Sequence, residues 1–250
     1  MKKLNRTPIP TCWDDNDSNK AKKRKRFYHN LRDDKGKIKP RWRKTCLDEN
    51  GYSHIQTHLL AMSKGHCAYC GKKIGLDELD VDHFLPKESF PYLAYCWENY
   101  LPSCKSCNQN LKHDISPASL AGKVIVEEIM KAEVTHDYVY NKAMLLGKIV
   151  TKDRIIDPSF DVPEDHLDFN PASLSYTHKT SIGKYTIDVF WSDQSCAEEW
   201  LSLSQFIQSL VINSSNMGSL EKTISSYIQL HGQEYVVRKL LNYWKGILGK

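Results

Sequence analysis

Asp82 and His83 are neighbours in the sequence, and two asparagines, Asn99 and Asn108, follow at short spacings. The ordinary pKa of imidazole lies close to neutrality, so His83 is the natural general base of this set. Carboxylate and amide oxygens are suitable ligands for a hard divalent cation such as Mg²⁺ or Mn²⁺. We therefore expect a base and a metal-binding group on one short segment of the chain, an arrangement that suits hydrolysis.

Two Cys-x-x-Cys pairs, Cys67/Cys70 and Cys104/Cys107, enclose the Asp-His dipeptide. Each pair forms a tight turn that can present two thiolates to one ion, and four thiolates fill the tetrahedral shell of zinc. We therefore expect a structural zinc ion, not a catalytic one. The 33 residues between the pairs exceed the usual separation in simple zinc ribbons and leave room for a functional insert.

Hydrolysis of a phosphodiester needs an activated water and positive charge near the developing phosphorane. In an extended strand, Asp82 and His83 point to opposite sides. Asp82 can then hold a cation while His83 faces the scissile phosphate. Taken singly, each of these residues is more often structural than catalytic. Together, in register between two zinc-binding turns, they favour catalysis.

The segment resembles the HNH nuclease family, whose core has the ββα-metal fold. The residues that carry the resemblance are Cys67 and Cys70, the Asp82-His83-Phe84-Leu85-Pro86 run, Asn99, Cys104 and Cys107, Asn108 and Lys112. They fall within about 46 of the 250 residues, and the motif is specific because so many positions agree together.

The resemblance implies a role for each residue. His83 corresponds to the general base, and Asp82 and Asn108 correspond to the ligands of a catalytic Mg²⁺ or Mn²⁺. Asn99 corresponds to the asparagine that holds the loop and orients the base, and Lys112 to a residue that reaches a substrate phosphate. The chain departs from many relatives at Asn108, where they have histidine. An amide oxygen can still ligate Mg²⁺, but Asn108 cannot titrate.

A second, less specific resemblance covers most of the chain. The Asp157-Pro158 step and the Pro163–Phe169 stretch, together with a short Pro-containing N-terminus, are similar to the PtuB-like HNH nucleases of Septu-type and retron-linked antiphage systems. Those nucleases work with an ABC/SMC-like ATPase, called PtuA-like. The resemblance implies that this chain is the effector nuclease and that the ATPase is its sensor.

Hydrophobic periodicity predicts the elements that must position these residues. Residues 53–63 have the pattern of a helix with Ser53 as its N-cap, and residues 79–85 alternate as a short strand. A helix should begin just after Cys104, over residues 105–113. Further helices are expected at residues 118–148, 195–213, 219–230 and 233–248, and the turn-rich residues 155–192 should hold short strands such as His166–Phe169.

We therefore expect an α+β, mainly helical protein with three regions. Residues 1–45 form a basic arm, residues 46–116 form the zinc-braced HNH core, and residues 117–250 form a mainly helical region. Residues 1–44 hold 16 Lys/Arg against 5 Asp/Glu, although the whole chain carries a net charge of only +5. Such an arm would attract a polyanion, or would simply be a solvated tail.

The composition excludes several other classes. Hydrophobic content of 40% and charged content of 26% are ordinary for a globular protein. No apolar run approaches the 18 to 20 residues, roughly, that cross a bilayer, and we see no secretion signal, so no membrane association is expected. Eight cysteines without signs of export favour metal binding in the cytoplasm over disulfides.

Two other interpretations of the sequence remain open. A non-catalytic zinc module would bind nucleic acid or a protein without turnover. A nuclease of the same fold could act on RNA, perhaps a tRNA, instead of DNA. The sequence does not separate DNA from RNA, because the motif would grip phosphates and contacts to a 2′-hydroxyl cannot be identified from it.

Overall fold

The structure is a computed structural model, and it describes residues 1–8, 10, 53–88, 94, 96–113, 115, 154–192 and 195–250. The core motif is a hairpin of two antiparallel strands followed directly by a short helix. Strand β1 (Leu79–His83) pairs with β2 (Tyr100–Cys104), so that Leu79 lies opposite Cys104 and His83 opposite Tyr100. A π-helix, η5 (Ser106–Lys112), follows β2, and a 3-10 turn, η4 (Trp97–Asn99), precedes it.

Helix α2 (His54–Met62) packs against both strands of this hairpin. Ser53 caps it, because its hydroxyl accepts a hydrogen bond from the backbone N–H of Ile55. Ile55, Leu59 and Met62 are buried on one helical face, in agreement with the spacing of apolar residues in the sequence. The helix, which precedes the first cysteine pair in the sequence, therefore covers one side of the hairpin.

A second hairpin follows the core motif in the sequence and precedes the C-terminal helices. The one-turn helix α5 (Pro163–His166) leads into β3 (Leu167–Asn170), which pairs antiparallel with β4 (Ser175–His178). Helix α6 (Ser181–Phe190) follows and packs against α5, β4 and η5. Its N-cap, Thr180, accepts from the N–H of Gly183. Thus α6 joins the second hairpin to the helix of the ββα motif.

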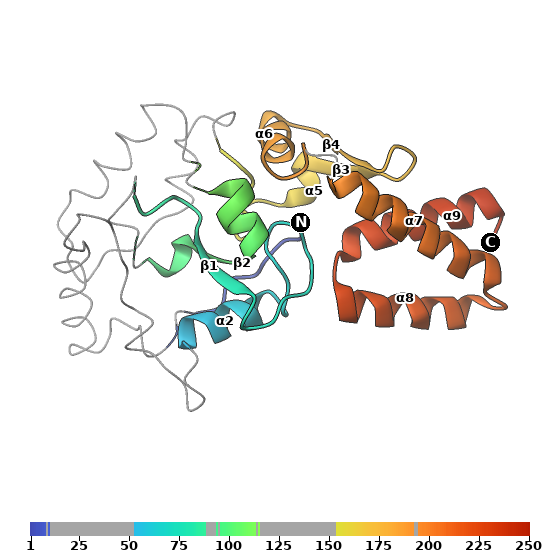
Figure 1. The fold of residues 1–250 in the computed structure, drawn as a ribbon, viewed down its shortest axis with the longest axis horizontal. Coiled ribbons are helices and arrows are strands. Elements are labelled where there is room, and N and C mark those ends of the chain that lie inside the picture. Colours follow the sequence, from blue (N-terminus) through green and yellow to red (C-terminus); the bar gives the residue numbers. More distant parts are fainter. Residues whose placement is uncertain are drawn as a thin grey trace.

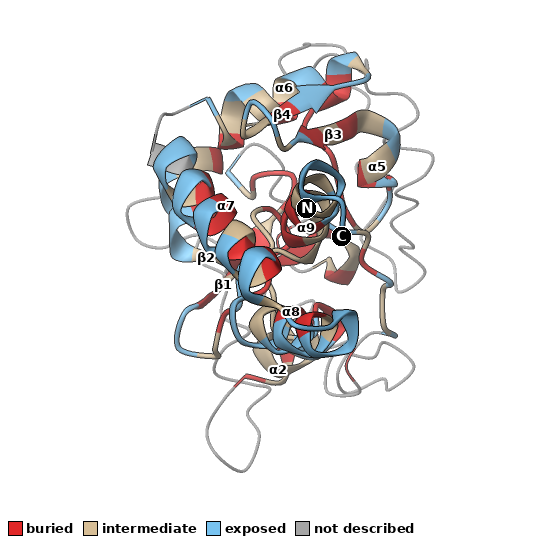
Figure 2. Cartoon of the chain, turned by 90° about the vertical axis from the view of Figure 1, so that its right-hand side faces the viewer, coloured by how far each residue is buried: buried red, intermediate tan, exposed pale blue. Residues whose placement is uncertain are grey.

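Three helices complete the chain: α7 (Ser195–Asn213), α8 (Met217–His231) and α9 (Glu234–Leu248). They form a bundle at the end of the molecule that carries the C-terminus (Figure 1). Both α7 and α8 pack on α9, and their outer surfaces are exposed while their inward faces are buried (Figure 2). None of the helices in the described ranges is long and apolar enough to cross a membrane.

Backbone hydrogen bonds connect the bundle to the first cysteine turn. The N–H of Gln233 donates to the carbonyl of Gly71 (2.8 Å), and the N–H of Lys73 donates to that of His231 (3.0 Å). Gly232, between α8 and α9, has φ +82°, and a Cβ there would meet the Gly71 oxygen at 2.3 Å. Glycine is therefore required for this close approach. The bundle and the ββα motif share one hydrophobic core.

The first residues of the chain pack on the same core and do not extend from it. Met1 and Leu4 are buried. The guanidinium of Arg6 donates to the carbonyls of Trp97 (2.8 Å), Glu98 (2.6 Å) and Tyr100 (2.7 Å). Residues 1–8 are thus held to the core by apolar side chains and by Arg6, and the basic arm expected over residues 1–45 stays a prediction. The Lys/Arg-rich run at residues 20–44 lies outside the described residues.

Most expected elements are present. The helix over 195–213 has the predicted bounds, and those at 54–62, 217–231 and 234–248 differ by at most two residues per end. The strand at 79–83 is shorter than expected, because the chain turns just after His83. Helix α6 falls in the segment where only short strands were expected. The helical pattern at 118–148 and both expected region boundaries lie outside the described residues.

Candidate active site

The four cysteines of the two Cys-x-x-Cys pairs meet in one place. Their Sγ atoms all lie within 4.8 Å of one another, and those of Cys70 and Cys104 are 3.9 Å apart. Tetrahedral zinc with Zn–S bonds of about 2.3 Å requires sulfur atoms about 3.8 Å apart, so the thiols fit this ion. Local structure prepares the site: the N–H of Gly71, at φ +76°, donates to the Cys67 carbonyl and closes the first turn.

Strand β1 divides the reactive side chains between its two faces. Asp80 and Asp82 share the face covered by η5, because alternate residues of a strand point the same way. The Nδ2 of Asn108 donates to Asp80 Oδ2 (3.2 Å), and so does Nε2 of Gln109 (2.6 Å). Asp82 is buried and forms an ion pair with Lys112 at 2.9 Å. The polar residues of η5 therefore lie along this face of β1, with two amides at Asp80 and one ammonium at Asp82.

This arrangement changes the role expected for Lys112. Its side chain is fully buried, and its ammonium donates to Asp82 Oδ1 and to the carbonyl of His83, both at 2.9 Å. In this structure the ammonium is the counter-ion of Asp82, because one turn of helix after Asn108 points inward to β1. A contact of Lys112 with a substrate phosphate stays a prediction.

The expected pair of metal ligands also has a different environment from the one anticipated. Asn108 is bonded to Asp80 and not to Asp82, whose two oxygens are held by Lys112 and by the hydroxyl of Tyr69. The donor set on this face, two carboxylates and two side-chain amides, still has the hard oxygen chemistry of Mg²⁺ and Mn²⁺ sites. A divalent cation at Asp82 would have to displace the ammonium of Lys112 or share the carboxylate with it.

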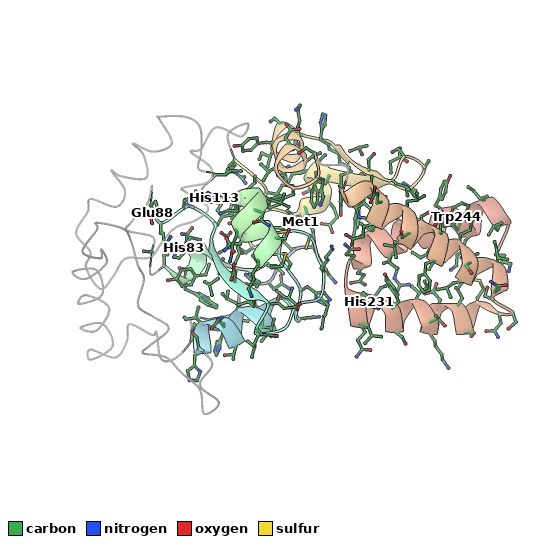
Figure 3. The ribbon with its side chains drawn as sticks, viewed as in Figure 1. Met1, His83, Glu88, His113, His231 and Trp244 are labelled. Atoms are coloured by element: carbon green, nitrogen blue, oxygen red, sulfur yellow. The ribbon has the colours of Figure 1, made fainter. Side chains whose placement is uncertain are left out.

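His83 lies at the end of β1 on the opposite face, at the side of the described structure that faces away from the helical bundle (Figure 3). Its Nε2 is 3.0 Å from the carbonyl oxygen of Ala94. A carbonyl only accepts, so Nε2 must carry the proton, and Nδ1 of the neutral ring is then the acceptor. The described residues give Nδ1 no hydrogen-bond partner. Nδ1 is thus the nitrogen of this ring that can accept a proton.

Two further contacts hold the imidazole. Its ring packs edge-on against Tyr100, its partner across the hairpin, with centroids 5.1 Å apart. The hydroxyl of Tyr100 donates to the same Ala94 carbonyl at 2.5 Å. Burial lowers the pKa of His83 to about 3, and the nearby ammonium groups of Lys87 and Lys112 act in the same direction. The imidazole is therefore neutral, the form that can accept a proton, throughout the neutral pH range.

Asn99 fixes the chain just after His83. Its Oδ1 accepts from the N–H of Leu85 and its Nδ2 donates to the carbonyl of Leu85, both at 2.9 Å. Its own carbonyl accepts from the N–H of Phe84 at 2.8 Å. Asn99 is fully buried, so these backbone groups have no access to water as an alternative. Asn99 therefore holds the turn that follows β1 through both its side chain and its backbone carbonyl.

Sequence reasoning missed four residues of the site. Tyr69 lies between Cys67 and Cys70 and donates to Asp82. Asp80 shares the face of Asp82, which strand alternation at 79–83 could have indicated. Tyr100 and the carbonyl of Ala94 hold His83, and no pattern in the sequence points to them.

Comparisons with known proteins agree with this geometry. Residues 67–114 match the family model described as HNH endonuclease. This range contains both cysteine pairs, β1, β2 and η5, so the chain carries an HNH endonuclease domain of the ββα-metal class. The comparison with solved structures gives no significant match.

Two curated relatives carry the same name. The chain is 33% identical to "Septu protein PtuB" of Bacillus thuringiensis over 148 residues, 58% of this chain and 43% of that protein. It is 24% identical to "Septu protein PtuB" of Bacillus mycoides (strain KBAB4) over 151 residues, 54% of this chain and 45% of that protein. The match therefore spans less than half the length of these curated relatives.

Proposed function

We propose that this chain is a metal-dependent endonuclease that hydrolyses phosphodiester bonds, with DNA as the favoured substrate, and that it is the effector of a bacterial antiphage defence system. The observation that supports it most is the state of His83. Its Nε2–H is bonded to the Ala94 carbonyl, so Nδ1, which is directed away from that anchor, is the nitrogen that can accept a proton. The HNH endonuclease match over residues 67–114 supports the same reaction.

In the proposed reaction, Nδ1 of His83 removes a proton from the attacking water while Nε2 stays bonded to the Ala94 carbonyl, which stabilises the charged ring. Asp82 and Asn108, with Asp80 beside them, would hold a divalent Mg²⁺ or Mn²⁺. When bound, that ion would supply the positive charge that stabilises the phosphorane and the departing 3′ oxygen. Asn99 keeps the turn after His83 in place. The products would carry 5′-phosphate and 3′-hydroxyl ends.

The four-cysteine site has no open position once zinc is bound, so its proposed role is structural. Four thiols gathered for one ion also suit a reducing compartment, and we propose the cytoplasm as the site of action. The similarity to Septu PtuB proteins supports a defence role and a partner, for which we propose an ABC/SMC-like ATPase of the PtuA type. A retron-linked system is an alternative genetic setting for the same pair.

The test is a cleavage assay on plasmid DNA and on RNA, with Mg²⁺ or Mn²⁺, and with and without the candidate ATPase. The variant His83→Ala should reduce cleavage by about 10²- to 10⁴-fold, the usual contribution of a general base. Its fold and zinc content should not change, because Tyr100 still bonds the Ala94 carbonyl. The control His178→Ala removes an exposed imidazole of β4 and should cut normally.

The possible results separate the alternatives. Undiminished cleavage by His83→Ala would refute the assignment of the base. Cleavage of RNA alone would make the protein an RNA nuclease of the same fold. Binding of nucleic acid without cleavage under every condition, including the presence of the ATPase, would leave a non-catalytic zinc module.

A further inference from the structure

Tyr69 links the zinc-binding turn to the carboxylate of the candidate active site. It lies between Cys67 and Cys70, and its side chain is fully buried. The ring stacks on Phe190 of α6, with centroids 4.6 Å apart and planes at 21°. The hydroxyl donates to Oδ2 of Asp82. A carboxylate oxygen only accepts, so the tyrosine hydroxyl is the donor of this bond.

Asp82 is thus held by two donors of different kind. Lys112 is a cation and binds Oδ1 at 2.9 Å, whereas Tyr69 is neutral and binds Oδ2. A divalent cation that approaches Asp82 repels the ammonium of Lys112, because both are positive. It does not repel a neutral hydroxyl. Tyr69 is therefore the donor that can stay on the carboxylate when a metal ion binds.

We infer that Tyr69 is a positioning residue for the metal-dependent reaction: it ties the Asp82 carboxylate to the zinc-binding turn and sets the orientation in which Asp82 meets a divalent cation. The inference rests on the proposed function, because it deepens the role given there to Asp82. It also assigns the structural zinc a part in the reaction, since the two cysteines on either side of Tyr69 fix the backbone that carries it.

Loss of the hydroxyl should weaken metal binding for two reasons that act in the same direction. Without Tyr69, Asp82 can rotate once Lys112 is displaced, so its oxygens are no longer fixed for the cation. In addition, Lys112 is then the one donor to the Asp82 carboxylate that remains among the described residues. The ion pair of Lys112 and Asp82 therefore tightens and competes more strongly with the metal. Phe190 keeps the aromatic ring in place, so the zinc-binding turn itself should not change.

The experiment compares Tyr69→Phe with the wild-type chain, both loaded with zinc. The control is Tyr235→Phe in α9. It removes the same kind of bond, since the hydroxyl of Tyr235 donates to the carboxylate of Asp168 at 2.7 Å. Three quantities are measured: zinc content, Mn²⁺ binding by electron paramagnetic resonance, and the Mn²⁺ concentration that gives half-maximal cleavage. Tyr69→Phe should raise the dissociation constant and the half-maximal concentration about tenfold, the usual effect of losing a hydrogen bond to a charged group.

In the expected result, zinc content is unchanged, and the rate at saturating Mn²⁺ falls less than the apparent metal affinity. A role in stability alone would lower the melting temperature without moving the Mn²⁺ dissociation constant, and that result would overturn the inference. Wild-type Mn²⁺ affinity in Tyr69→Phe, or an equal loss in Tyr235→Phe, would overturn it as well.

A second variant covers the case in which Tyr69→Phe does not fold. Phe190→Leu removes the stacking partner of Tyr69 but keeps its hydroxyl, and should raise the half-maximal Mn²⁺ concentration by about threefold. An unchanged value there would refute the inference. A wild-type protein that neither binds Mn²⁺ nor cuts nucleic acid, even with the ATPase, would instead refute the proposed function and the inference with it.

Discussion

At the scale of single residues, the imidazole of His83 and the carboxylate of Asp82 lie on opposite faces of β1, because successive side chains of a strand alternate between its faces. His83 faces the loop that carries Ala94, while Asp82 faces η5 and the zinc-binding turn. Neighbours in sequence therefore have different surroundings: one ring is neutral with an accepting nitrogen, and one carboxylate is buried among donors. The strand therefore places an accepting nitrogen and a charged carboxylate on its two opposite faces.

Asn99 allows a test of how the turn after His83 is held. Asn99→Ala leaves the N–H and the carbonyl of Leu85 buried without their side-chain partner. Each of the two unsatisfied groups costs about 1–3 kcal/mol, so the free energy of unfolding should fall by about 2–6 kcal/mol in urea denaturation. The control Asn242→Ala, at an exposed position of α9, should change it by less than about 0.5 kcal/mol.

A loss below about 1 kcal/mol for Asn99→Ala would contradict the prediction. It would mean that water or another backbone group replaces the amide, and that the turn does not depend on Asn99. Loss of cleavage should accompany the loss of stability, because the same turn positions His83.

At the scale of elements, α6 is the helix that joins the two halves of the described structure. It packs on η5 at one side and on α5 and β4 at the other, and Phe190 near its end supports Tyr69. Its first turn approaches the backbone of His166 so closely that only glycine fits at position 183. The position of α6 thus affects both the second hairpin and the environment of Asp82.

Gly183→Ala should therefore destabilise the protein. An added Cβ would lie 2.1 Å from the carbonyl oxygen of His166 and 2.9 Å from its carbon, and neither backbone atom can move alone. We expect a cost of about 1–3 kcal/mol, the range of overpacked cores, measured by thermal unfolding. Gly246→Ala is the matched control in α9, where an added Cβ meets nothing within 4 Å.

The control should change stability in the opposite direction. Alanine is a better helix former than glycine, so Gly246→Ala should stabilise the protein by about 0.5–1 kcal/mol. Equal melting temperatures for the two variants would contradict the close approach of α6 to His166.

At the scale of the whole molecule, side chains from distant parts of the sequence hold the last helix to the second hairpin. Asp168 of β3 accepts from the hydroxyl of Tyr235 and pairs with the ammonium of Lys239, each at 2.7 Å. Lys239, and then Tyr235, lower the pKa of Asp168 to about 2. The α8–α9 junction is in turn bonded to the first cysteine turn, so the C-terminal bundle supports the zinc site.

The stability that Asp168 contributes should depend on pH. Its pKa in the folded protein lies below its ordinary value of 3.8, so the contribution is present above pH 3.8 and is lost as the pH falls toward 2. Asp168→Asn should lower the melting temperature at pH 7 and differ less and less from the wild type between pH 4 and pH 2, roughly. The control Asp77→Asn removes an exposed carboxylate that has no ion pair among the described residues.

If the melting-temperature difference for Asp168→Asn stays the same from pH 7 to pH 2, the ion pair with Lys239 does not account for it. A comparable pH dependence in Asp77→Asn would point to net charge as the cause.

The sequence determined the four-cysteine site and most helices of the described residues, for reasons that are local. Thiol pairs at fixed spacing form turns whatever surrounds them, and apolar periodicity indicates both a helix and its buried face, as in α2 and α7. The HNH motif likewise predicts a general base at His83 and a metal ligand at Asp82, because it depends only on residue types at fixed spacings.

Only the tertiary structure decided which side chains meet across elements. The distance along the chain between Asp82 and Lys112 or Tyr69 does not encode their contact, which follows from how η5 and the zinc-binding turn pack on β1. The same holds for the Ala94 carbonyl that sets the proton on His83, and for α6, whose start depends on a glycine pressed against His166. Hydrogen bonds and charges act over a few ångströms in space, so their partners are chosen by packing and not by spacing in the sequence.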